Sequence, residues 1–204
     1  MSARRTNKEK ILSIAVGGVC LALAFVLSKI TIFELPMGGS VTPASTLPII
    51  VCGMAFGPVW GFVVAIVYSI LQLIDGLKYF VSPFQMFLDY FVGYAVLGIA
   101  GFAGLSSENR LKIKNPLLRF RRAGIIKTVV STVVAYLVRW LGCVASGVIF
   151  YGEYAADAGY DNVLIYSMVY NGSFLAADLG ICIAALIILY FIIPSKSKAA
   201  PDIK

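Results

Sequence analysis

Apolar runs long enough to cross a membrane recur along this chain, and they constrain its fold more than any other feature. A membrane-spanning helix needs about 20 predominantly apolar residues to cross a hydrocarbon core of about 30 Å. Of the 204 residues, 60% are hydrophobic and 13% are charged, and the mean hydropathy is +0.90. The alternation typical of a membrane β-barrel is absent, so we expect helical spans. The sequence therefore predicts an integral membrane protein.

The apolar runs predict an all-α integral membrane protein with six transmembrane helices in a single domain, residues 1–204. The second helix is short and ends before the sequence GPVW. The first apolar run is about twice as long as that of a signal peptide and lacks a convincing cleavage site, so it is predicted to be a retained helix. The predicted ranges are 11–30, 46–56, 58–74, 83–104, 123–151 and 163–193.

Most of the 17 basic residues fall in segments that would share one side of the membrane. These are Arg4, Arg5, Lys8, Lys10, Arg110, Lys112, Lys114, Arg119, Arg121, Arg122, Lys127, Lys196, Lys198 and Lys204. The positive-inside rule places both termini and the loop 105–122 in the cytoplasm. The loop can also attract anionic lipid, and without interleaved aromatics it does not favour a nucleic-acid partner. The opposite face is acidic, with Glu34, Asp75, Glu153, Asp157 and Asp161.

Several classes of site are disfavoured by residues that the chain lacks. Histidine, the commonest metal ligand and general base, does not occur. Neither a phosphate-binding GxxxxGK[ST] motif nor a soluble segment large enough for a nucleotide-binding domain is present, so ATP-driven transport would need another chain. The cysteines, Cys20, Cys52, Cys143 and Cys182, lie in apolar segments and are expected to be reduced, packed thiols. We expect no metal, no cofactor and no enzymatic activity.

Three ionisable side chains lie inside predicted spans, where each costs at least about 2.5–3.5 kcal/mol. They are Asp89, Arg139 and Asp178. Asp89 is expected roughly 9 Å below the outer end of its helix, within reach of a ligand from outside. Two interpretations of Asp89 are open: a counter-charge for a cationic ligand, or an ion pair with Arg139. Asp178 is expected deeper, where a structural hydrogen bond or ion pair is favoured.

Aromatic and amide side chains, with one small residue, accompany Asp89 at the predicted outer ends of the spans. They are Tyr79, Tyr90, Gly147, Tyr151, Tyr166, Tyr170 and Asn171. Together they suit a flat, cationic, hydrogen-bonding small molecule. An interfacial aromatic belt, helix packing at Gly147 and an interhelical bond from Asn171 would explain the same residues without a ligand. The Gly- and Pro-rich segment 34–48 is either a lid over such a pocket or an ordinary connector.

Four segments carry a resemblance to a known family: LPMGGSVTPASTLPI, DGLKYFVSPFQMFLDY, ASGVIFYGEYA and YSMVYNGS. The sequence resembles the thiamine-specific substrate-binding components of the energy-coupling factor transporters over nearly its whole length. The resemblance implies a six-helix protein of a prokaryotic plasma membrane that captures thiamine from outside with high affinity. It also implies partners, namely a transmembrane coupling subunit and two cytoplasmic ATPase subunits, and a toppling of the whole subunit during transport.

The resemblance assigns roles to particular residues. Asp89 would face the thiamine cation, while aromatic and amide groups clasp its two rings. The implied ligand residues are Asp89, Tyr90, Tyr79, Cys143, Gly147, Tyr151, Tyr166 and Asn171. Gly18 and Ala22 would dock onto the coupling subunit, although a small-xxx-small pair is also a common packing motif.

The chain departs from the family pattern at three of these positions. Asp89 is one methylene shorter than the usual glutamate, Cys143 replaces a histidine, and Tyr151 stands where some relatives have tryptophan. The implied consequence is lower affinity, or a thiamine precursor or analogue as ligand. A subunit for another vitamin, such as riboflavin, and a proton-coupled carrier in which Asp89 titrates are the competing hypotheses. An intramembrane enzyme is disfavoured, because no paired acids or Ser-Lys arrangement share one face.

Overall fold

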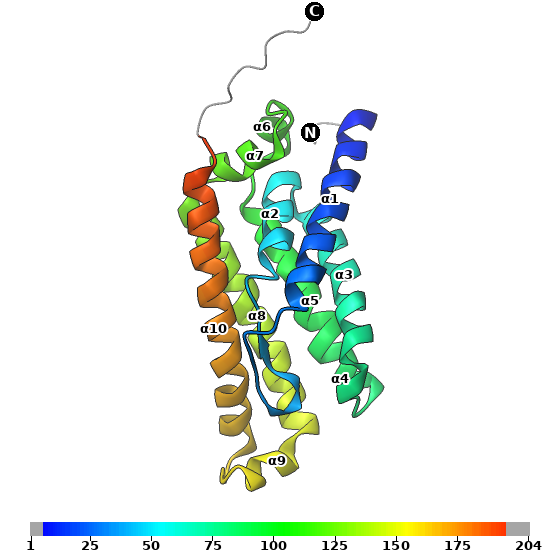
Figure 1. Ribbon diagram of the computed structural model, residues 1–204, viewed down its shortest axis with the longest axis vertical. Coiled ribbons are helices and arrows are strands. Elements are labelled where there is room, and N and C mark those ends of the chain that lie inside the picture. The colour runs from blue at the N-terminus through cyan, green and yellow to red at the C-terminus, as the bar shows by residue number, and fades with distance from the viewer. Residues whose placement is uncertain (1–5, 195–204) are drawn as a thin grey trace, which may run out of the picture.

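The apolar runs form helices that pack side by side along the long axis of the molecule (Figure 1) in the computed structural model, which describes residues 6–194. Within those residues five helical spans are long and apolar enough to cross a membrane: Asn7–Ser28, Pro58–Tyr79, Pro83–Ala103, Ile125–Phe150 and Val163–Ile192. The structure is thus that of an all-α membrane protein. The additional helix α2, Leu47–Phe56, has only 10 residues, so six complete crossings remain a prediction.

Local sequence signals explain where the helices begin and end. Helix α1, Asn7–Ser28, starts before the predicted residue 11 because the Thr6 hydroxyl accepts a hydrogen bond from the Glu9 N–H. Helix α2 and helix α3, Pro58–Asp75, are separated at Gly57, whose φ of 88° ends the first, while Pro58 starts the second. Helices α8, Ile125–Phe150, and α10, Val163–Ile192, lie within two residues of their predicted ranges.

The fourth span is not a uniform α-helix, although the sequence predicted one run at 83–104. It comprises α4, Pro83–Met86, a π-helical segment η3, Phe87–Val92, then α5, Gly93–Ala95, and a 3₁₀ segment η4, Val96–Ala103. A π-helix is wider than an α-helix, so it shifts the faces on which the following side chains point, and such segments are frequent at functional sites. Asp89 and Tyr90 lie within it.

Glycines bring α2, α3 and η4 into backbone contact. A methyl group on Gly53 would lie 3.2 Å from Gly101 Cα, and one on Gly61 would lie 3.1 Å from the Gly98 carbonyl oxygen. Small residues allow membrane helices to approach this closely. We call these four residues the glycine seam. The seam lies toward the end of the bundle that holds the start of α1 and the end of α10, which we call the termini end (Figure 1).

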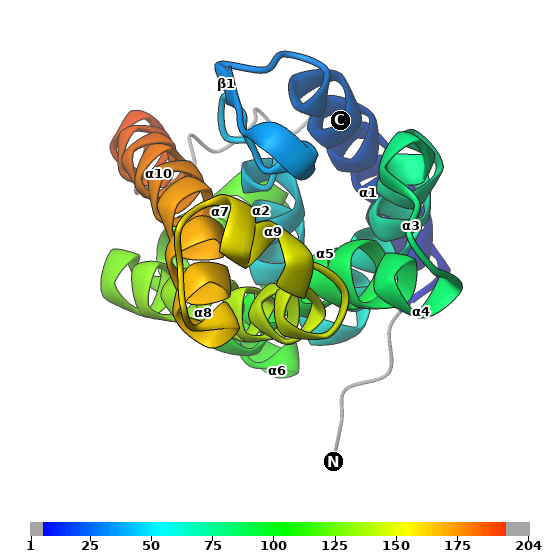
Figure 2. The ribbon, with the colours of Figure 1, turned by 90° about the horizontal axis from the view of Figure 1, so that it is seen from below.

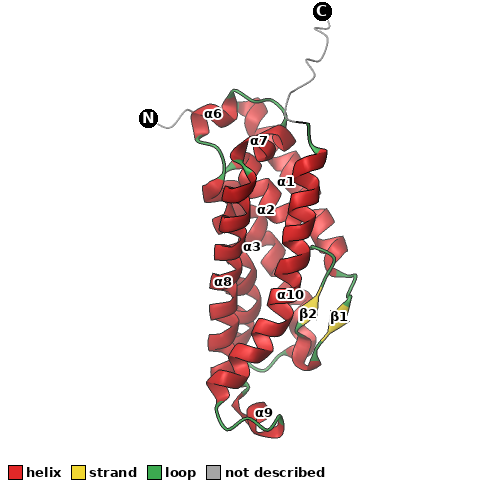
Figure 3. Ribbon diagram, turned by 90° about the vertical axis from the view of Figure 1, so that its left-hand side faces the viewer, coloured by secondary structure: helices red, strands yellow, loops and turns green. Residues whose placement is uncertain are grey.

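The Gly- and Pro-rich segment folds back at the opposite end of the bundle. Strands β1, Phe33–Glu34, and β2, Ser40–Val41, pair antiparallel, and the 3₁₀ turn η1, Pro36–Gly38, joins them. Seen from below, this hairpin lies between α10 and α1 (Figure 2), and Figure 3 shows its strands beside α10. We call residues 33–41 the lid. The short helices η2, Gly76–Tyr79, and α9, Gly152–Asp157, complete the lid end.

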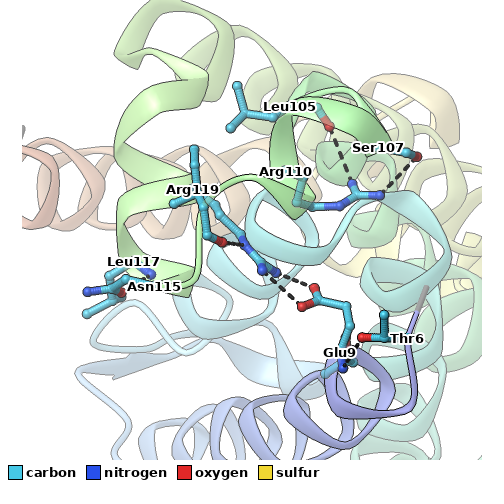
Figure 4. A network of polar contacts seen from close by, with 10 residues as sticks. Thr6, Glu9, Leu105, Ser107, Arg110, Asn115, Leu117 and Arg119 are labelled. Atoms are coloured by element: carbon cyan, nitrogen blue, oxygen red, sulfur yellow. Dashed lines mark hydrogen bonds and ion pairs between the residues drawn. The ribbon is translucent and has the colours of Figure 1, made fainter. Parts of the chain in front are cut away.

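At the termini end, the predicted loop 105–122 contains two short helices, α6, Ser107–Leu111, and α7, Pro116–Ala123. Figure 4 shows how this segment is held: the Arg119 guanidinium makes a two-pronged ion pair with Glu9 of α1. Arg119 is only 1% exposed, and its Nε also donates to the Ile113 carbonyl at 2.7 Å. The basic residues Arg4, Arg5, Lys196, Lys198 and Lys204 lie outside the described residues, and the cytoplasmic placement of this end remains a prediction.

Candidate functional site

A cavity of about 720 Å³, counted with its open mouth, lies at the lid end between the fourth span, α8 and α10. The lid covers one side of it. Its lining is Met37, Gly38, Gly39, Ser40, Gln85, Asp89, Tyr90, Tyr94, Arg139, Cys143, Gly147, Tyr151, Tyr166, Ser167, Tyr170, Asn171 and Phe174. The mixed aromatic and polar lining suits a small organic molecule.

Seven of the eight expected ligand residues line this cavity: Asp89, Tyr90, Cys143, Gly147, Tyr151, Tyr166 and Asn171. Tyr79 does not. It lines a neighbouring cleft, and its ring packs so closely on the lid that a methyl group on Gly38 would lie 2.7 Å from it. Its hydroxyl donates to Glu34 of β1. In the described structure Tyr79 therefore holds the lid rather than lining the pocket.

Asp89 is half-buried, and its partner is a neutral group. Gln85, one turn earlier, donates to the carboxylate at 2.6 Å, and Ser146 of α8 lies beside it. Among residues 6–194, no ion pair within 4.0 Å joins Asp89 to Arg139 or to any other basic side chain. The structural interpretation of Asp89, an ion pair with Arg139, is therefore wrong in this conformation, because the two residues lie at different depths.

Arg139 occupies the inner part of the cavity. It is 6% exposed, and its guanidinium carbon lies 4.1 Å from the centre of the Tyr94 ring and 5.9 Å from that of Tyr136. Cation–π contacts of this kind compensate part of the cost of burying the charge. The sequence marked Arg139 as costly, but it gave no indication that Tyr94 lies beside it. That neighbour depends on how α8 packs against the fourth span.

Gly147 allows α8 and α10 to approach each other closely. A methyl group there would lie 2.1 Å from the Ser167 hydroxyl, which donates to the Val144 carbonyl at 2.9 Å. Asn171 also spans the two helices, because its Nδ2 donates to the Cys143 carbonyl at 3.3 Å and to the Ser167 carbonyl at 3.0 Å. Helix packing at Gly147 and an interhelical hydrogen bond from Asn171, the two roles that need no ligand, are thus both present. The amide oxygen of Asn171 has no hydrogen-bond donor among the described residues.

Tyrosine rings continue along α10 toward the cavity mouth. The rings of Tyr166 and Tyr170 are 5.9 Å apart at an angle of 31°, and Tyr170 meets Phe174 edge-on at 5.9 Å. Tyr170 and Phe174 are pocket residues that the family resemblance did not assign. Their spacing of four on one helix face was the available signal. A row of aromatic faces can stack on a flat ligand and attract a cation.

The lid is closed over the cavity by contacts with α10. The Tyr170 hydroxyl donates to the Pro36 carbonyl and accepts from the Gly39 N–H at 3.2 Å. Val41 of β2 is 4% exposed and packs with Phe174 and Cys143. Gly39 and Ser40 thereby become pocket residues. The sequence favoured a lid only weakly, because two-residue strands give no periodic signal.

Asp178 fixes Thr42, the residue that follows the lid. One carboxylate oxygen accepts from the Thr42 N–H at 3.1 Å and from the Thr42 hydroxyl at 3.0 Å, and the other accepts from the Tyr136 hydroxyl at 2.7 Å. Asp178 is 3% exposed and is not part of the cavity lining. The expected structural role of Asp178 is thus confirmed, and its function is to join lid, α8 and α10.

Glu34 connects the lid to η2 on the opposite side. Its carboxylate accepts from the Tyr79 hydroxyl and from Lys78 Nζ at 3.3 Å. The Tyr79 bond, and secondly the Lys78 contact, hold the pKa of Glu34 below its ordinary value. The charged carboxylate is therefore the form that keeps this side of the lid in place.

The described residues offer no metal centre. No group of three or more His, Cys, Asp or Glu side chains gathers within residues 6–194. All four cysteines are buried and free, as the sequence predicted. The lining of the cavity offers a carboxylate, aromatic rings and hydrogen-bonding groups, which can recognise a ligand by charge, stacking and hydrogen bonding.

Comparisons with known proteins identify the family of the chain. The family model described as thiamine transporter protein (Thia_YuaJ) matches residues 14–198. The thiamine transporter ThiT of Bacillus subtilis (strain 168) is 26% identical over 191 residues, which are 93% of this chain and 94% of that protein. The solved structure of ThiT from Listeria monocytogenes has the same fold, with a TM-score of 0.70, 17% identity, and coverage of 90% of this chain and 95% of that chain. The chain therefore belongs to the thiamine transporter protein family, whose members are multi-pass proteins of prokaryotic membranes.

Proposed function

We propose that this chain is the thiamine-binding subunit of an ATP-driven energy-coupling factor importer, capturing thiamine at the outer face of the membrane. Family membership supports thiamine transport, and the names of both similar proteins agree with it. The observation that carries the proposal is the cavity itself. It presents a carboxylate without a basic partner among the described residues, Asp89, beneath tyrosine rings and a latched lid.

The electrostatics of the cavity favour a cationic ligand at Asp89. Because Gln85 is neutral, its hydrogen bond orients the carboxylate without neutralising it. The attraction between Asp89 and a ligand cation is stronger in this partly buried site than in water. Tyr90 and Tyr151 border the same cavity and offer aromatic faces to the thiazolium ring.

Asn171 supports recognition of the second ring. Its amide nitrogen is already bonded to the Cys143 and Ser167 carbonyls, which fixes the amide and leaves its oxygen as an acceptor. An exocyclic amino group, as thiamine carries on its pyrimidine ring, is a donor that fits this acceptor. Gln85 on the fourth span and Asn171 on α10 thus line the cavity from different helices.

Helix α1 carries an exposed surface that suits a partner protein. Gly18 and Ala22 are both on the exposed side of this helix, and a methyl group on Gly18 would meet nothing within 4 Å. Ile14, 61% exposed, and Val19, 60% exposed, flank them. We assign this surface to the transmembrane coupling subunit, which in turn binds the two ATPase subunits. ATP hydrolysis then belongs to partner chains, and the present chain is not an enzyme.

The test is ligand binding by the purified protein. Mass spectrometry of the small molecule that copurifies, followed by calorimetric titration with thiamine, its pyrimidine precursor and riboflavin, is expected to select thiamine. A tighter complex with riboflavin or with the precursor would overturn the substrate assignment. Proteoliposomes containing this chain alone are expected to bind thiamine without accumulating it, and accumulation driven by a proton gradient would indicate a carrier instead.

A further inference from the structure

The cavity has two charged levels. On α8, Ser146 lies beside Asp89, and Arg139 lies seven residues earlier, which corresponds to about 10 Å along the helix axis. The fourth span runs in the opposite direction. Its Tyr94 ring centre lies 4.1 Å from the Arg139 guanidinium carbon, and Asp89 comes five residues before Tyr94. Asp89 is therefore at the lid level of the cavity, and Arg139 is at the inner level.

The guanidinium of Arg139 lacks strong acceptors among the described residues. It carries five N–H donors, and the faces of the two aromatic rings beside it are weaker acceptors than an oxygen or nitrogen atom. Nε is buried without a hydrogen-bond partner in residues 6–194. The polar side chain that it approaches is the thiol of Cys143, which is a weak acceptor. Buried polar groups are almost always satisfied, so an acceptor from the ligand is expected at this level.

The position of Arg139 also restricts which part of a ligand can lie beside it. A second cation placed in the same buried space would be repelled by the guanidinium, whereas a neutral heteroaromatic ring with an acceptor nitrogen would be attracted. Asn171 lies between the two levels, since its amide bonds to the Cys143 carbonyl. A ring nitrogen of the ligand can therefore accept from Arg139 while a donor group on the same ring donates to the Asn171 amide oxygen.

We propose that Arg139 is a ligand-binding residue that donates a hydrogen bond to a ring nitrogen of the aminopyrimidine and so sets the direction in which the ligand lies. This inference rests on the proposed function and goes beyond it by assigning opposite ends of the ligand to Asp89 and Arg139. The cationic ring is placed at the lid level, and the neutral ring at the inner level.

The experiment is a calorimetric double-mutant cycle between protein and ligand. The ligands are thiamine, two pyridyl analogues in each of which one pyrimidine ring nitrogen is replaced by C–H, and a neutral analogue with thiophene in place of thiazolium. The proteins are wild type, Arg139→Met, Arg139→Lys and a control, Arg121→Met. Arg121 stacks 3.5 Å from the centre of the Tyr190 ring at the termini end, so its replacement removes a cation far from the cavity.

The wild type is expected to bind one pyridyl analogue at least tenfold more weakly than thiamine. Arg139→Met is expected to bind thiamine at least tenfold more weakly and no longer to distinguish that analogue from thiamine. The thiamine affinity of Arg139→Lys should fall between those of wild type and Arg139→Met, and that of Arg121→Met should resemble wild type. Relative to thiamine, the affinity for the thiophene analogue should fall by the same factor in wild type and in Arg139→Met.

Two results would overturn this inference without overturning the proposed function. One is a wild type that binds thiamine and both pyridyl analogues equally. The other is an Arg139→Met protein that still discriminates between thiamine and the analogue that wild type binds weakly. Equal wild-type affinities overturn the inference even if Arg139→Met does not fold, and Arg139→Lys then supplies the second test of the residue. Wild type that binds none of the four compounds would overturn the proposed function, and this inference with it.

Discussion

The hydroxyl of Tyr170 on α10 accepts a hydrogen bond at 3.2 Å from the backbone N–H of Gly39, a residue 131 positions earlier in the lid. The same hydroxyl donates to the Pro36 carbonyl. Pro36 and Gly39 flank the sharp turn in which Met37 and Gly38 have positive φ values of 68° and 93°. One oxygen atom thus joins both ends of the lid turn to the bundle.

Tyr170→Phe is expected to open the lid more often without removing the ring from the cavity wall. Two neutral hydrogen bonds contribute together about 1–3 kcal/mol, so the dissociation rate of thiamine should rise about tenfold. Stopped-flow displacement measures that rate. Tyr160→Phe is the matched control, because Tyr160 packs on Tyr166 but does not line the cavity. An unchanged dissociation rate in Tyr170→Phe would show that the latch is unimportant.

Asp89→Asn is expected to weaken thiamine binding by at least about 1.4 kcal/mol, which is tenfold, because the counter-charge is lost. Asp89→Glu should retain binding, since the charge remains. Calorimetry at constant ionic strength measures both. Asp157→Asn removes an exposed acid from α9 at the same end and should bind as wild type does. Equal affinity in wild type and Asp89→Asn would contradict the charge argument.

Gly18→Leu and Ala22→Leu are expected to leave thiamine binding intact and to abolish uptake, because a leucine on this face of α1 would separate two packed helices. Binding is measured on the purified chain, and uptake in cells that express the partner chains. Val130→Leu on the exposed face of α8, where Val130 is 56% exposed, controls for a larger side chain facing lipid. Normal uptake in both α1 variants would remove the docking assignment.

The lid should loosen in acid through Glu34. Its pKa is lowered by Tyr79 and Lys78, so the contact stabilises the closed lid above the ordinary glutamate pKa of about 4.3 and is lost as pH falls through the lowered value. Thiamine dissociation should therefore accelerate below about pH 4. Thiamine should dissociate faster from Glu34→Gln than from wild type at neutral pH. The acceleration below about pH 4 should be absent from this variant. If the step persists in Glu34→Gln, another carboxylate causes it.

Glu9→Gln is expected to destabilise the protein strongly, because Arg119 would be left as a buried charge without its partner. Breaking a buried pair in this way typically costs about 3–5 kcal/mol. Thermal unfolding in detergent measures the effect, while thiamine affinity should change little because the pair lies at the termini end. Glu108→Gln disrupts the exposed pair with Lys112 and should leave the unfolding temperature unchanged.

Apolar runs and capping residues together specified most of the helix positions. Gly57 and Pro58 divide α2 from α3 where the sequence indicated, and Asn162 caps α10 by accepting from the Leu164 and Ile165 N–H groups. These signals are local, so a single sequence contains them. The π-helical turn around Asp89 has no comparable signal, because it depends on packing against neighbouring helices.

The partners of the charged residues could be predicted only in part. Arg139, Cys143, Gly147 and Tyr151 recur every four residues, a spacing that puts them on one face of a helix, and all four line the cavity. Spacing within a helix does not give the register between helices, however. That register puts Tyr94 rather than Asp89 beside Arg139, and it moves Tyr79 out of the cavity onto the lid. Both outcomes required the three-dimensional structure.

The glycine seam bears on how a ligand reaches and leaves the cavity. Where Gly53 meets Gly101 and Gly61 meets Gly98, backbone lies against backbone, and none of these four glycines lines the cavity. We expect a ligand that enters past the lid to leave past the lid. A cavity that opens only past the lid exchanges ligand with a single compartment, and its occupancy follows the ligand concentration in that compartment. If the chain delivers its ligand across the membrane, as we propose, a movement beyond the opening of the lid must expose the cavity to the other compartment.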